Sequence, residues 1–247
     1  MSKLILHVPH AGTAIPDKTG YVVSVKDLAA EQLLLTDWYT DDLFDHDLGQ
    51  LVRADFSRLF CDPERFVEDH LEVMSKAGMG VLYEMRDNGN RMRVVSPLHK
   101  DEVIKKYYDP HHALLNAAVA KSLEQYDTAC LLDCHSFPDK PFQRDLSQQT
   151  PRPDFNIGTD AFHTPKELTE KAEQFFRDRG YTVGIDWPYS GALVPMMHYQ
   201  KNKKVKAIML EINRKLYLEP GTNTKSSNYE VIKSLVKEFE LFLLNTI

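Results

Sequence analysis

The run 129–137, Ala-Cys-Leu-Leu-Asp-Cys-His-Ser-Phe, constrains the fold of this chain more than any other stretch. Its first half is apolar and has the length of a buried strand. It then changes abruptly, because Asp133, His135 and Ser136 fall within four positions. Ligands of open α/β sheets bind outside the carboxyl ends of the strands, so we expect a functional site where this strand ends.

Two side chains of this run are candidates for chemistry. Residues two apart in a strand point to the same face, which places Asp133 and His135 together. His135 is a candidate metal ligand or base, and Asp133 is placed to orient its imidazole. The structural alternative is an aspartate that caps the next turn, beside a hydrogen-bonded histidine.

A second histidine occupies a similar position near the N-terminus. Residues 3–8 read as a strand, and the Pro-His-Ala-Gly sequence that follows breaks it. His10 therefore lies at a strand end, as His135 does. The pair is more informative than either histidine alone.

A carboxylate is embedded in another expected strand. Residues 205–212 are apolar except for Lys206 and Glu211. Burial of a carboxylate is costly and raises its pKa, which suits a general base or acid. A buried salt bridge with Arg58 or Arg214 is the structural alternative for Glu211.

Between these strands the sequence suggests helices and further candidates. Residues 26–50 have helical periodicity, and Asp37 either caps a helix beginning at Trp38 or serves as a metal ligand. Residues 56–61 read as a strand carrying Arg58. Residues 100–126 read as a long helix with a kink or break at Pro110.

The second half continues the alternation of strands and helices. A proline-rich segment, 138–165, is expected to form a long loop that serves as a lid or pocket wall beside the 129–137 run. Amphipathic helices are expected over 165–180, with a capping box at Thr164, and over 228–246. Alternating elements predict a single α/β domain with a mixed, mostly parallel sheet.

Composition excludes several function classes. The chain has 247 residues and a net charge of −6, so it is not expected to bind nucleic acid or an anionic membrane surface. Its three cysteines form no CxxC pair, which argues against a disulfide framework or a structural zinc knuckle. The chain shows no signal peptide and no apolar run of ~20 residues, so we expect a cytoplasmic protein.

Seven segments in order resemble the N-formylglutamate amidohydrolase family. They are PHAGTAIP, TDWYTDDLF, SRLFCDPERF, GMGVLY, DCHS, PDFNIGT and LEINRKLY, and the likeness extends over residues 4–220. That family is similar in fold to zinc carboxypeptidases and aspartoacylases.

The resemblance implies a catalytic zinc ion, or another divalent metal, held by His10, Asp37 and His135. Zinc at a catalytic site takes three protein ligands plus water. The HxxE pattern of carboxypeptidases is absent, because Thr13 stands where its glutamate would be. Asp37 is assigned in its place, since it matches the Asp-Trp step of the family.

The resemblance also implies roles for residues outside the metal site. The catalytic group consists of Glu211 as general base and acid, with Arg58 or His112 stabilising the oxyanion. The expected substrate-binding residues are Arg65, Arg214, Gly80, Ser136 and Tyr189.

The implied activity is metal-dependent cleavage of the N-acyl amide of an acidic amino acid, such as N-formyl-L-glutamate. The DPERF and INRKLY segments differ from the DLNR variant linked to histidine degradation, so the reaction type is better specified than the substrate. Alternatives are a zinc deacylase or carboxypeptidase-like enzyme acting on another N-acyl amino acid or peptide, and a non-catalytic anion-binding relative. A hydrolase based on Ser136 or Cys134 is disfavoured, because the chain lacks a GxSxG nucleophile elbow.

Overall fold

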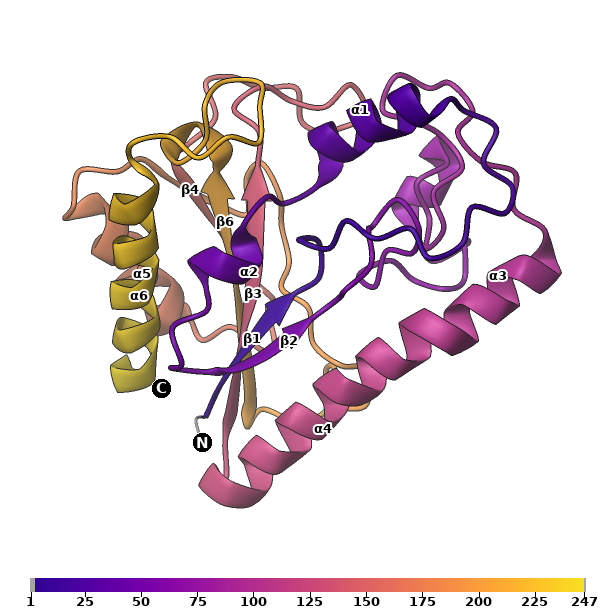
Figure 1. Ribbon diagram of the computed structural model, residues 1–247. Helices are drawn as coiled ribbons and strands as arrows, with labels where there is room; N and C mark the ends of the chain where they lie inside the picture. Colours follow the sequence, from indigo (N-terminus) through magenta and orange to yellow (C-terminus); the bar gives the residue numbers. More distant parts are fainter. Residues whose placement is uncertain (1–2, 247) are drawn as a thin grey trace.

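A six-stranded sheet forms the centre of this computed structural model, which describes residues 3–246 (Figure 1). The strand order is β2-β1-β3-β6-β4-β5, and β4 runs antiparallel to β6. The strands are β1 (Leu4–Val8), β2 (Gln50–Arg53), β3 (Ala129–Phe137), β4 (Phe155–Gly158), β5 (Val183–Ile185) and β6 (Val205–Asn213). The predicted mixed, mostly parallel sheet of an α/β domain is confirmed.

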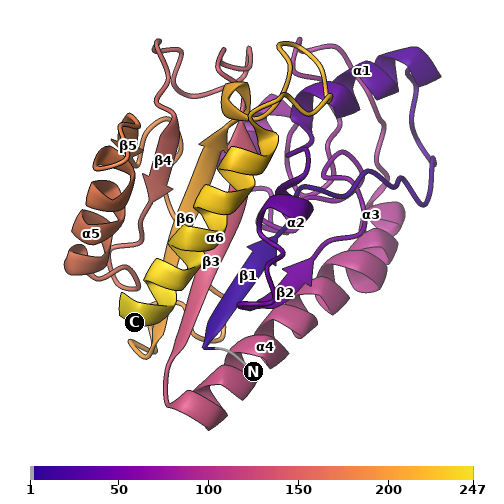
Figure 2. The same cartoon turned by 60° about the vertical axis from the view of Figure 1, so that its left-hand side comes forward.

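Helices cover both faces of this sheet. Figure 2 shows α5 and α6 on one face and α4 on the other. The α-helices are α1 (Val25–Leu35), α2 (Thr40–Leu43), α3 (Pro97–Val103), α4 (Asp109–Tyr126), α5 (Lys166–Arg177) and α6 (Tyr229–Thr246). Short 3-10 helices η1 (Val73–Ala77) and η3 (Arg214–Leu216) and a π-helical turn η2 (Ile104–Tyr108) complete the elements.

The alternation of side chains along β3 places the polar residues on the α4 side of the sheet. Cys130, Leu132 and Cys134 pack in the apolar cluster that includes α5 and α6. On the other face, Ala129 and Leu131 pack against α4. That same face becomes polar in the last third of the strand, where Asp133 and His135 follow. The sequence change therefore marks the point at which the apolar core ends and a site begins.

Two corrections concern residues 56–61 and Asp37. The predicted strand at 56–61 is wrong, because turns occupy this stretch and Phe56 alone forms a bridge, with Ala14. At Gly12 an added Cβ would lie 2.5 Å from the Phe56 carbonyl oxygen, so the glycine allows the two loops to approach closely. Asp37 does not cap a helix at Trp38; its side chain turns into the site instead.

The other predicted helices form with shifted boundaries. The 100–126 pattern is divided by the π-helical turn η2, which ends two residues before Pro110. Helix α5 begins after Pro165 without a side-chain cap, because the Thr164 hydroxyl donates to the Ala207 carbonyl oxygen instead, at 2.6 Å. None of the helices within residues 3–246 combines the length and apolarity needed to cross a bilayer.

Candidate metal centre and active site

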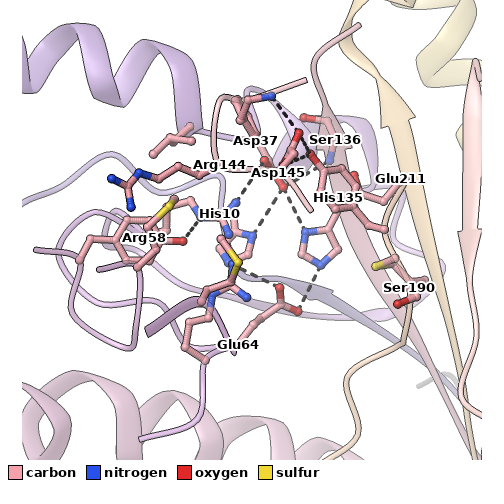
Figure 3. Close-up of a pocket in the computed structure, with 18 residues that line it drawn as sticks. His10, Asp37, Arg58, Glu64, His135, Ser136, Arg144, Asp145, Ser190 and Glu211 are labelled. Atoms are coloured by element: carbon pink, nitrogen blue, oxygen red, sulfur yellow. Dashed lines mark hydrogen bonds and ion pairs between the residues drawn. The ribbon is translucent and has the colours of Figure 1, made fainter. Parts of the chain in front are cut away.

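A cavity of about 190 Å³, lined by charged, polar and apolar side chains, lies at the carboxyl ends of the central strands, where sheet and loops meet. Its walls come from β3, β6 and several loop segments far apart in the sequence (Figure 3). Of the residues predicted to form the site, His10, Asp37, Arg58, Arg65, His135, Ser136, Tyr189 and Glu211 line it. The predicted loop after β3 supplies a wall through Phe142, Arg144 and Asp145.

The two histidines meet because β1 and β3 are neighbours. Strand β1 pairs with β3 in parallel, and His10 lies two residues beyond its end. The ring centroids of His10 and His135 are 5.0 Å apart, and both side chains are buried. Two imidazoles from different halves of the chain therefore face one small volume.

Asp37 completes the group from the turn between α1 and α2. Its backbone N–H donates to the His10 carbonyl oxygen at 3.1 Å, which ties the turn to the end of β1. Asp37 Oδ2 lies 3.1 Å from His135 Nδ1 and 3.6 Å from His10 Nδ1. His10, Asp37 and His135 thus form one of the groups in the described chain with ligand atoms close enough to share a metal ion.

The donor atoms of this group fit a zinc-type ion. Ligands about 2.0–2.1 Å from a tetrahedral zinc lie roughly 3.3 Å apart, close to the two distances to Asp37 Oδ2. His10 Nδ1 is buried and has no hydrogen-bond partner among the described residues. Its Nε2 lies 2.8 Å from Asp62 Oδ1, so the ring donates there and turns a free lone pair toward Asp37 and His135.

The charge around the two imidazoles also favours a cation. Burial and the charge of Arg58 oppose protonation of His10, yet Asp62 and Glu64 raise its pKa. Burial likewise opposes protonation of His135, but Glu64 and Asp133 raise the pKa of this ring well above its usual value. Metal binding replaces ligand protons, so the carboxylate charges that favour protonation of the two histidines also favour a bound divalent ion.

Two further groups of potential ligands lie next to this one: His10–Asp62–Glu64, which shares His10 with it, and His7–Glu64–Asp133, which shares Glu64 with the former. In each, an imidazole nitrogen is already 2.8 Å from an aspartate oxygen, in the pairs His7–Asp133 and His10–Asp62. Asp133 Oδ1 also lies 3.2 Å from His135 Nε2. Asp62 and Asp133 are therefore placed to orient the histidines, the role expected of Asp133 from the sequence.

Glu211 stands beside the His10–Asp37–His135 group, on the neighbouring strand. It is the register partner of His135 across the β3–β6 pair, so both side chains leave the sheet on the same face. Glu211 Oε2 is buried without a hydrogen-bond partner in residues 3–246. Burial, with Asp37 acting in the same direction, raises the pKa of Glu211 to about 8. A carboxyl group that exchanges a proton near neutral pH is suited to acid–base catalysis.

Three arginines line the cavity in different electrostatic states. Arg58 lies 3.0 Å from Asp62 Oδ2, and Arg65 approaches Asp62 and Glu72 at 3.5 and 3.6 Å. Arg144 instead donates to backbone carbonyl oxygens of Asp87, at 3.2 Å, and of Ala77. Within the described residues its guanidinium makes no ion pair, which leaves it available to an anionic ligand.

Arg214 and Tyr189, two other predicted substrate-binding residues, differ in whether they line the cavity. Arg214 lies outside the cavity lining and donates to Asp37 Oδ1 at 2.9 Å and to Ser136 Oγ at 3.1 Å. This position favours support of Asp37 over contact with a substrate. Tyr189 does line the cavity, with its hydroxyl donating to Asp145 at 3.0 Å.

Gly80 and His112 lie away from the metal group. Gly80 is not part of the cavity wall, and a Cβ there would stand 3.3 Å from Asp69 Oδ1. His112, at the start of α4, has Nε2 2.8 Å from the Pro63 carbonyl oxygen and lines a second, adjoining cavity. Neither position brings these residues to the reacting centre.

Sequence reasoning missed Asp62, Glu64 and Arg144. The first two stand in the Asp-Pro-Glu-Arg segment, in which only the arginine was predicted to contact a ligand. Glu64 nevertheless lies 3.2 Å from His135 Nε2 and 3.5 Å from His10 Nε2. Glu64 could have been predicted, because it is a second acidic residue two positions after Asp62. Arg144 lies in an irregular loop, where no sequence pattern indicates that it reaches the cavity.

Comparisons with known proteins agree with this architecture. The N-formylglutamate amidohydrolase from Ralstonia eutropha JMP134 superposes with a TM-score of 0.87 and 24% identity, covering 100% of this chain and 94% of that one. A gene product of Agrobacterium tumefaciens superposes with a TM-score of 0.73 and 16% identity, covering 99% and 90%. These likenesses show a shared fold, while no curated protein sequence matches the chain. The sequence profile of N-formylglutamate amidohydrolases matches residues 2–218, and the chain therefore belongs to this family of hydrolases.

Proposed function

We propose that the protein is a zinc-dependent amidohydrolase that cleaves the N-acyl amide of an acidic amino acid, such as N-formyl-L-glutamate, to formate and glutamate. The observation that carries the proposal is the group His10 Nδ1, Asp37 Oδ2 and His135 Nδ1, with Glu211 on the adjacent strand. Family membership supports the same reaction type.

His10, Asp37 and His135 would hold the ion. Bound there, a divalent ion would supply Lewis acidity, which would activate a water molecule and polarise the acyl carbonyl. Asp62 and Asp133 keep the two imidazoles in the orientation that such binding requires.

Glu211 performs the proton transfers. Its buried carboxylate takes a proton from the attacking water and delivers it to the leaving nitrogen, so that water and amide become a carboxylic acid and an amine. Arg58 lines the same cavity and stabilises the negative charge that develops on the acyl oxygen.

The substrate's carboxylates face the cationic side of the cavity. Arg58 and Arg65 are partly neutralised by neighbouring acids, whereas Arg144 retains its charge for a ligand. A volume of about 190 Å³ also suits a small amino acid derivative better than a drug-sized ligand, for which pockets of about 300 Å³ or more are usual.

Hydrolysis of N-formyl-L-glutamate by the zinc-loaded protein, followed as formate release, tests the proposal. Glu211→Gln should lose roughly 10²-fold or more of the rate, since it removes the general base. The matched control is Glu219→Gln, an exposed glutamate that should leave the rate unchanged.

A non-catalytic relative predicts another outcome. It would bind glutamate in the wild-type and Glu211→Gln forms alike and would release no formate from either. That result, obtained with zinc bound, contradicts the proposal.

A further inference from the structure

A second cavity adjoins the metal cavity on the side of Glu64 and Ser190. The two share Glu64, Arg65, Ser190 and Met209 in their walls, so these residues form the neck between them. The second cavity, which we name the side chamber, measures about 380 Å³. In Figure 3, Glu64 lies on the opposite side of the two imidazoles from Asp37.

The wall of the side chamber is largely apolar. The apolar and aromatic residues that line it are Phe66, Tyr108, Ala192, Leu193, Val194, Met196, Tyr199 and Met209. Phe66 and Met196 are 43% and 62% exposed. Large apolar side chains exposed around a cavity mouth are typical of sites that bind apolar ligands.

Beyond the neck, the polar side chains of this wall make hydrogen bonds within the protein, whereas Arg65 Nε, at the neck, has no partner in residues 3–246. His112 Nε2 is bonded to the Pro63 carbonyl oxygen, and Asp133 Oδ2 accepts the Leu193 backbone N–H at 2.9 Å. Asp160 Oδ1 accepts the backbone N–H groups of Phe162 and His163. A polar ligand would therefore have to displace existing bonds, whereas an apolar one only removes exposed apolar surface from water.

We propose that the side chamber binds the acyl chain of the substrate, and that this chain is an apolar group longer than formyl. The inference rests on the proposed amidohydrolase function and specifies its substrate class. The amino acid part occupies the arginine side of the metal cavity, and the acyl chain passes the neck beside Ser190. A formyl group ends at the scissile carbonyl and leaves the side chamber unused.

A series of N-acyl-L-glutamates tests this assignment. With the zinc-loaded protein, kcat/KM should rise from N-formyl through N-acetyl and N-butanoyl to N-hexanoyl. Each fully buried methylene contributes about fourfold, so a gain above about tenfold between acetyl and hexanoyl is expected even for partial burial. A series in which formyl is the best substrate, or in which the values stay level, overturns the proposal.

A pair of neighbouring methionines gives matched variants. Met196→Asp places a charge at the chamber mouth, whereas Met197, 67% exposed, lies outside the chamber wall and Met197→Asp is its control. Met196→Asp should lower kcat/KM for N-hexanoyl-L-glutamate at least fivefold and change that for N-formyl-L-glutamate less than twofold. Equal effects of the two variants on the hexanoyl substrate contradict the assignment.

Affinity measurements test the side chamber independently of the proposed hydrolytic function. The zinc-loaded Glu211→Gln variant is titrated with the same compounds by calorimetry, so that affinity is measured without turnover. If no compound is hydrolysed by the wild-type protein, the proposed function fails. Tighter binding of hexanoyl than formyl, lost in Met196→Asp, still identifies the chamber as an acyl-binding site, and equal affinities reject it.

Discussion

Replacing Asp62 by asparagine tests how the protein prepares His10 for a metal ion. The Asp62 carboxylate is fully buried and lies 2.8 Å from His10 Nε2, 3.0 Å from Arg58 and 2.7 Å from the Tyr83 hydroxyl. Although burial opposes it, the charges of His10 and Arg58 lower the pKa of Asp62. Asparagine keeps the shape of the side chain but removes the charge that orients the His10 N–H.

The expected loss is 10- to 100-fold in zinc affinity, the usual effect of removing such a partner. This corresponds to about 1.4–2.7 kcal/mol of binding free energy. The assay is competition against a chromophoric zinc chelator at pH 7.5, with the melting temperature of the metal-free variant as a check on folding. Asp55→Asn is the matched control, because the Asp55 side chain is 81% exposed. A zinc Kd within twofold of wild type for Asp62→Asn refutes the reasoning.

Three further predictions concern other parts of the molecule. Glu240 of α6 is fully buried with both carboxylate oxygens unpartnered in residues 3–246, and burial raises its pKa from 4.5 to about 9. At pH values below the pKa of this carboxyl in the unfolded chain, the raised pKa leaves the free energy of unfolding unchanged. As the pH rises from there toward 9, the free energy of unfolding falls increasingly, by about 3 kcal/mol at pH 7. Glu240→Leu should therefore raise the melting temperature clearly more at pH 8 than at pH 5, and an equal change at both would exclude this explanation. Arg144→Gln should raise KM for N-formyl-L-glutamate about tenfold or more with a smaller change in kcat, because a charge-assisted bond to the substrate is worth about 1.5–3 kcal/mol; an unchanged KM argues against this contact. The rate should rise with pH as Glu211 ionises, with an apparent pKa at or below about 8 because a nearby cation favours the carboxylate, and a rate that is level from pH 5 to 9 would rule out its role as base.

Much of the sheet was predictable because the local sequence of its central strands is distinctive. The apolar starts of β1, β3 and β6 specify buried strands, and the polar residues at their ends mark the edge where a site forms. His10, His135 and Glu211 follow from this rule alone. Asp37 was ambiguous, since a short polar residue after a helix equally suits a cap, and only tertiary contacts with the two histidines decide between the readings.

The loops were less predictable for a physical reason. The stretch 56–61 has strand-like composition, but strands need a partner edge, and the loop beside it forms only the Ala14–Phe56 bridge. Arg144 and Glu64 reach the site through irregular segments, where no periodicity links sequence position to direction. Their roles depend on contacts between residues distant in the chain, such as Arg144 with Asp87.

The central claim is that one divalent ion is bound by His10, Asp37 and His135. An anomalous difference map from a crystal of the zinc-loaded protein tests it most directly. One strong peak is expected, about 2 Å from His10 Nδ1, His135 Nδ1 and an Asp37 oxygen. A peak held instead by His7, Glu64 and Asp133, or full activity in crystals and solution without any peak, would contradict it.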